Sequence, residues 1–233
     1  MKLFKILIIL VLITVSNIKV AFSASGAASV YKITIQQIAL CETGSALNNC
    51  LNPVVVYEAD SGTIDIASTT AGAAAATLGS ATEAVVGTSY TYVQVVMNRL
   101  ITISGTGISD GTNTCGTAGG TAATVGDNAV GVAGAGAGEL VVAAGFAGAA
   151  PGTNAFSGHT AVTEVTQTPN QDPDNDTYFQ WRVALAAPFV YDGIQNPSVS
   201  IAFGTDNALS FNQGDSGTCD AYASAPDVTI TIN

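Results

Sequence analysis

The apolar residues of this chain recur with a period of two almost everywhere a pattern can be read. The clearest case is the segment 90–104, where apolar side chains occupy alternate positions at Val93, Val95, Met97, Ile101 and Ile103. Alternate residues of a β-strand point to opposite faces of a sheet, so this pattern predicts strands that are buried on one face. The exception is the Ala-rich stretch 71–80, where we expect at most one short helix.

Runs of this kind, separated by clusters of Gly, Asn, Asp and Pro, predict an all-β protein, an antiparallel β-sandwich of about eight strands. The expected strands cover residues 30–40, 53–58, 63–67, 90–104, 139–144, 178–191, 198–203 and 227–233. In the first of them the alternation changes phase at Gln36–Gln37, which predicts a β-bulge.

Two segments are rich in Gly, Ala and Thr and poor in large apolar side chains. They are 116–138 and 145–158. We expect both to be long, flexible surface excursions, with packing of the run 130–138 against a neighbouring chain as the alternative.

The first 23 residues have the pattern of a secretory signal peptide. Lys2 and Lys5 precede an uncharged apolar run from Ile6 to Val15, and small residues follow around Ser23. The apolar run is shorter than the roughly 20 residues that a membrane-spanning helix needs. We therefore expect a signal peptide at 1–23 and one mature β-sandwich domain at 24–233.

The charge balance excludes several classes of partner. The full chain has a net charge of −11, and removal of residues 1–23 leaves three cations against 17 acids, a net charge of −14. The cations are Lys32, Arg99 and Arg182. Such a chain repels nucleic acid and anionic lipid, so we expect no nucleic-acid partner and no stable membrane insertion after cleavage.

The four cysteines are Cys41, Cys50, Cys115 and Cys219, an even number in a chain that we expect to be exported. Oxidising compartments favour disulfides, and three pairings are available to four cysteines. We favour a local Cys41–Cys50 bridge, which leaves Cys115–Cys219 to close a loop of about 100 residues. A loop of that length is worth about 4–5 kcal/mol in the chain-entropy view.

Two motifs resemble catalytic signatures but lack the required context. Gly214–Gly217 contains Ser216 in the tetrapeptide of chymotrypsin-like proteases, and His159 precedes it, yet too few residues separate them for that architecture. The glycine-rich run 134–138 is followed by no helix-forming segment that could bind a phosphate. We expect no enzymatic activity.

One acidic cluster is chemically suggestive. Asp172, Asp174 and Asp176 place carboxylates at alternate positions, as in the first half of a calcium loop. The turn glycine is missing, and Val183 stands where a bidentate glutamate would be. The cluster is thus either a calcium site or a solvated acidic turn, and we expect no other cofactor.

Arg99 lies in phase with the apolar face of its strand. A guanidinium there needs a carboxylate or several carbonyl groups, so we expect a structural role with an acid such as Asp65 or Glu58.

Several segments resemble a family of secreted bacterial domains with a transthyretin-like (prealbumin-like) β-sandwich, whose activity is uncharacterised. The resemblance rests on motifs in Tyr31–Ile35, Thr63–Ser68, Thr88–Val95 and Val199–Leu209, and the likeness as a whole extends over about half of the mature chain. It implies the fold and export, and it implies no activity.

These observations favour a secreted, non-enzymatic structural or surface protein, such as a filament, matrix or adhesive subunit that associates with itself or with other surface proteins. The alternative is an extracellular module that binds a carbohydrate or small ligand by stacking on Tyr178, Trp181 and Tyr191. The cell surface or the medium is the expected location, with the periplasm as the alternative.

The signal peptide generates the first prediction. The exported protein should begin between Ala24 and Gly26, because the small residues around Ser23 suit signal peptidase. Intact-mass measurement checks this, and an exported form that retains Met1 would contradict it.

Overall fold

The chain is almost entirely β-strand in this computed structural model. The described residues are 24–47, 49–68, 74–109, 113–124, 129–144, 160–162, 177–194, 197–213 and 218–232. Every strand pair in them is antiparallel, and the expected all-β sandwich class is confirmed. None of the helices in these ranges has the length and apolarity needed to cross a bilayer.

Sixteen strands are present in the described ranges, about twice the number expected. They are β1 (Ala24–Gly26), β2 (Ala28–Glu42), β3 (Val54–Glu58), β4 (Thr63–Asp65), β5 (Ala74–Ser80), β6 (Ser89–Asn98), β7 (Leu100–Ser109), β8 (Asn113–Thr121), β9 (Ala129–Ala133), β10 (Leu140–Ala143), β11 (Thr160–Val162), β12 (Tyr178–Val190), β13 (Ser198–Gly204), β14 (Leu209–Gln213), β15 (Thr218–Ala223) and β16 (Asp227–Ile232). Two one-turn 3₁₀ helices, η1 (Ile66–Ser68) and η2 (Ala81–Glu83), follow β4 and β5.

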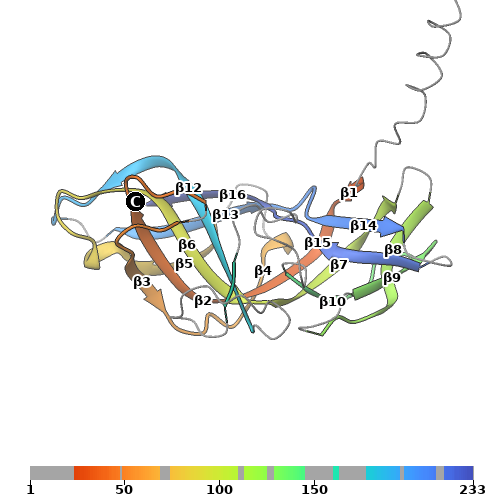
Figure 1. The fold of residues 1–233 in the computed structure, drawn as a ribbon. Coiled ribbons are helices and arrows are strands. Elements are labelled where there is room, and N and C mark those ends of the chain that lie inside the picture. The colour runs from red at the N-terminus through yellow and green to blue at the C-terminus, as the bar shows by residue number, and fades with distance from the viewer. Residues whose placement is uncertain are drawn as a thin grey trace, which may run out of the picture.

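A long two-stranded ribbon runs through the centre of the molecule. β2 pairs with β7 through its first residues and with β6 through the rest, so β6 and β7 act as one strand antiparallel to β2 (Figure 1). On its other edge β2 pairs with β4 and β3. The ribbon therefore connects the strands at the two ends of the elongated molecule.

The ribbon bends at Arg99. The register between β2 and β6 shifts between Ile35 and Gln37, which confirms the expected bulge. Opposite, the single residue Arg99 separates β6 from β7. Its amide donates to the Thr177 carbonyl at 2.9 Å, and its carbonyl accepts from the Ala144 amide at 2.7 Å. Backbone groups that leave the ladder at the bend thus find new partners.

The sandwich forms around the β6 half of the ribbon. A three-stranded sheet, in the order β16–β13–β5, covers the large sheet there. The facing layers meet in an apolar core to which β2, β6, β12, β13 and β16 each contribute two residues: Ile33, Ile35, Val95, Met97, Trp181, Val183, Ile201, Phe203, Val228 and Ile230. Alternation on each strand points these side chains inward.

The β7 half of the ribbon continues into a sheet of small residues. Its strand order is β1–β14–β15–β9–β8–β7, at the right of Figure 1. The Cys115–Cys219 disulfide joins β8 to β15 across the intervening β9. A Cβ at Gly131 of β9 would lie 2.8 Å from the Gly116 carbonyl oxygen and 3.3 Å from the Cys219 carbonyl oxygen. Glycine therefore permits the close approach of these three strands.

The segment 116–138 is not the surface excursion that its composition predicts. It contains most of β8 and all of β9, and β9 pairs with a neighbour on each edge. Thr117 is fully buried, and its hydroxyl bonds to the backbones of Gly105 and Gly138. The small residues of this segment allow neighbouring strands to pack closely, backbone against backbone. The second predicted excursion, 145–158, lies outside the described residues.

The stretch 71–80, where we expected at most one short helix, contains a strand in its described part. Residues 74–80 form β5, which pairs with β13. Alanine favours a helix locally, but pairing with β13 satisfies the backbone groups of this segment in a sheet. Gly79 has a φ of +73°, and a Cβ there would lie 2.2 Å from the Val56 carbonyl oxygen of β3. The close approach of β5 to β3 thus depends on this glycine.

Gly116 provides a test of the ordered glycine-rich sheet. A Cβ at Gly116 would lie 2.2 Å from the Ala135 carbonyl oxygen, whereas a Cβ at Gly136 would meet nothing within 4 Å. Gly116→Ala should lower the free energy of unfolding by about 1–3 kcal/mol, the usual cost of overpacking. Gly136→Ala is the matched control and should change it little. Urea denaturation measures both, and equal effects would contradict the packing described here.

Candidate functional site

The last strand lies at an edge of the small sheet. β16 pairs only with β13 among the described strands, and it also contacts β12 of the facing sheet. No backbone hydrogen bond joins its outer edge to any strand in the ranges described. The expected alternation is confirmed, since Ile230 is buried while Thr229 and Thr231 are exposed. This edge has the unpaired backbone groups to which another strand can add.

Exposed apolar side chains cluster at the loops next to this sheet. Val85 and Val86 are 58% and 63% exposed, and Ile194 is 86% exposed. The two loops touch, because the Gly87 amide donates to the Tyr191 carbonyl at 2.9 Å and Val86 lies against Gly193. We call Val85, Val86, Val190 and Ile194 the apolar tip.

The apolar tip lies at the end of the small sheet where β16 finishes. The register of β13 with β16 pairs Val199 with Ile232, and the Ala81 amide donates to the Pro197 carbonyl. The tip residues flank these positions in sequence. The unpaired edge and the exposed apolar surface thus belong to one region of the molecule.

Both expected disulfides are confirmed. Cys41 bonds to Cys50, and Cys115 bonds to Cys219. Three of the four cysteines are buried: Cys41, Cys115 and Cys219. The first bridge closes the loop after β2, and the second fastens the β8–β9–β15 sheet.

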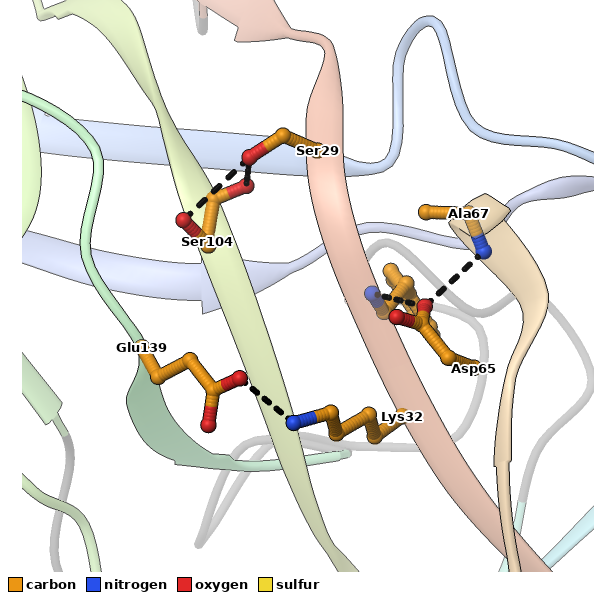
Figure 2. Close-up of polar contacts among 7 residues, drawn as sticks. Ser29, Lys32, Asp65, Ala67, Ser104 and Glu139 are labelled. Carbon is orange, nitrogen blue, oxygen red and sulfur yellow. Dashed lines mark hydrogen bonds and ion pairs between the residues drawn. The ribbon is translucent and has the colours of Figure 1, made fainter.

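The three cations among the described residues have different surroundings. Lys32 forms an ion pair with Glu139 across the β2–β7 ribbon, as Figure 2 shows. The Nε of Arg99, which is 1% exposed, donates to the Ala144 carbonyl at 3.1 Å. In the described residues neither Asp65 nor Glu58 forms an ion pair with Arg99, contrary to expectation. The Asp65 carboxylate instead accepts from the amides of Tyr31 and Ala67 (Figure 2).

Arg182 is buried, and none of the acids in the described ranges pairs with it. It is 5% exposed, its Nη2 donates to Gln180 Oε1 at 2.7 Å, and its Nη1 donates to the Leu47 carbonyl at 3.4 Å. The buried Nε has no hydrogen-bond partner. Burial lowers the pKa of Arg182 from its ordinary value, because desolvation disfavours the charged form.

Sequence reasoning did not single out Arg182. It alternates with Trp181 and Val183, so the pattern places it on the face of β12 that points away from the core. A strand with one apolar face predicts a solvated cation there. Two features of the sequence hint that Arg182 is buried. Gln180 lies on the same face of the strand, and the chain contains few other cations.

The aromatic residues proposed for ligand stacking are differently placed. Trp181 is 8% exposed and lines the sandwich core, while Tyr191 packs against that core and lies 6.5 Å from the Phe189 ring. Tyr178 is half-buried. Trp181 therefore packs within the protein, as expected of a core aromatic residue.

The other residues considered from sequence lie outside the described ranges. They are the calcium candidates Asp172, Asp174 and Asp176, and the pair His159 and Ser216. In the part of the chain that the structure describes, no group of three His, Cys, Asp or Glu side chains is placed to hold a metal ion.

Comparison with known proteins finds no protein-family model, no curated protein and no solved structure that matches this chain. The fold shows only the structural class of the protein, which is antiparallel all-β with two disulfides. The transthyretin-like resemblance stays a prediction.

Trp181 is the only tryptophan of the chain and generates a prediction of its own. Trp181→Ala should lower the free energy of unfolding by about 3–5 kcal/mol, as for large buried aromatic residues. The fluorescence of the native protein should be blue-shifted and resist quenching by iodide. Urea denaturation and quenching measure these effects. A stable Trp181→Ala variant that loses only sugar binding would favour the stacking site.

Proposed function

We propose that this protein is an exported, non-enzymatic subunit of an extracellular filament, matrix or adhesive surface. The observation that carries the proposal is the unpaired outer edge of β16 beside the apolar tip. An edge strand offers backbone donors and acceptors, and apolar side chains nearby gain free energy when a second surface covers them.

The protections usual for edge strands are scarce on β16. Monomeric sheet proteins often place lysine, proline or a bulge on a free edge. β16 carries one acid, Asp227, at its start, and its register with β13 is continuous from Asp227 to Ile232. A regular edge of six residues is long enough for a strand of another chain to pair with it.

The two disulfides support the exported part of the proposal. Cys41–Cys50 and Cys115–Cys219 leave no free cysteine among the described residues, and such bonds persist in oxidising compartments. The N-terminal signal pattern agrees with this location.

Thr231→Lys tests the proposal. Thr231 is exposed on β16, so a lysine there should leave folding unchanged while its charge and bulk hinder strand addition. The fraction of mature protein in large assemblies should fall several-fold, as measured by sedimentation velocity and negative-stain microscopy.

Thr114→Lys is the matched control. Thr114 is also exposed, but it lies on β8, whose two edges pair with β7 and β9. It adds the same charge without touching a free edge, so assembly should persist. A wild-type protein that remains monomeric at high concentration would overturn the proposed function.

A further inference from the structure

The face of the large sheet that points away from the sandwich core carries a row of buried polar side chains. Arg182 of β12 lies opposite Gln94 of β6, and Gln180 and Gln37 flank the same β6 strand at Val96. All four polar residues are less than 9% exposed. Long amide side chains and a guanidinium are rarely buried together on the outside of a sheet without a binding partner for their polar atoms.

The guanidinium of Arg182 lacks the partners that its charge requires. Of its five N–H groups, one on Nη2 bonds to Gln180 and one on Nη1 makes the long 3.4 Å contact to the Leu47 carbonyl. Nε has no hydrogen-bond partner among the described residues, and the one ion pair in those ranges is Lys32–Glu139. A buried cation without an anion is strongly destabilising, so this position is suited to receive one.

We propose that Arg182 anchors a binding site for a carboxylate, with Gln180 and Gln94 beside it on the outer face of the β6–β12 sheet. This goes beyond the proposed assembly, because the site lies on the large sheet and not on the edge of β16.

The chemistry selects a carboxylate over other anions. Nε–H and Nη–H on one side of a guanidinium match the two oxygens of a planar carboxylate. Of the cations that remain in the mature chain, Lys32 is bound to Glu139 and Arg99 lies at the bend of the ribbon. A single guanidinium in an acidic protein balances one negative charge, which suits a monoanion better than a phosphate dianion.

The loop closed by the Cys41–Cys50 disulfide lies next to Arg182. Its base is fixed by the Cys41–Cys50 bond and by the Thr43 amide, which donates to the Ser89 carbonyl at 2.8 Å. Leu47 is 41% exposed and reaches Arg182 by the 3.4 Å contact alone. An incoming carboxylate lies along the Nε–Nη2 edge of the guanidinium, where one oxygen accepts from Nε and the other from the second N–H of Nη2. Nη1 keeps its contact with the Leu47 carbonyl.

The carboxylate can come from a free organic acid or from an acidic side chain of a second copy. Arginine Nε–H resonances of the ¹⁵N-labelled mature protein provide a direct test, because the chain has two arginines. Sodium acetate and sodium glucuronate are the probes, and glucose and sodium chloride at equal ionic strength are the controls. The Arg182 signal should shift and saturate with either carboxylate, while the Arg99 signal stays in place.

Arg182→Gln and Lys32→Gln form a matched pair, since each removes one positive charge. Without ligand, Arg182→Gln should unfold at an equal or higher temperature than wild type, because it removes an uncompensated buried charge. Acetate should raise the melting temperature of wild type and of Lys32→Gln, and should leave that of Arg182→Gln unchanged.

Three outcomes overturn the proposal: an Arg182 signal that ignores carboxylates, an equal acetate response in Arg182→Gln, or a large loss of stability in that variant without ligand. Sedimentation with saturating acetate separates the two sources. Dissolved assemblies would identify an acidic side chain of a second copy, and intact assemblies would identify a free acid. Failure of assembly in every condition would overturn the proposed function and leave the NMR result to decide this site.

Discussion

The pairing of β2 with the continuous β6–β7 strand is the interaction on which the rest of the structure depends. It is the one ribbon present at both ends of the molecule, and each further strand is added to it or covers it. The bulge on β2 and the bend at Arg99 let the ribbon change direction without leaving backbone groups unpaired. The sandwich core can therefore form on one half while the glycine-rich sheet forms on the other.

Charge is the second constraint on this protein. Residues 24–233 contain three cations, which leaves few surface ion pairs to hold copies together, and the net negative charge opposes the approach of two copies. The proposed assembly therefore relies on backbone pairing and apolar contact, for which the β16 edge and the apolar tip are suited. The buried guanidinium of Arg182 is where we propose that a carboxylate binds, so the two proposed sites lie on different surfaces and use different interactions.

The sequence by itself determined the class of fold. Period-two alternation placed Val95, Met97 and Ile230 on the face that lines the sandwich core, and the phase change at Gln36–Gln37 located the bulge. It did not predict that the other face of β6, with Gln94 and Val96, is buried as well. The two disulfides also followed from the chain, because a nine-residue separation favours a local bridge and leaves one partner for each remaining cysteine. These features depend on local periodicity and spacing, which a sequence displays directly.

Tertiary structure alone decided the roles of the small residues and of Arg182. The alanines of β5 favour a helix by themselves, and pairing with β13 overrides that preference. The glycines of β8 and β9 favour no regular element, and the close approach of β8, β9 and β15 sets their conformation. Arg182 looks like a solvated cation in the sequence. It becomes a buried, incompletely bonded one because Leu47, distant in sequence, lies against it. Non-local contacts of this kind leave no periodic pattern in a sequence, and they determine which polar atoms lose water.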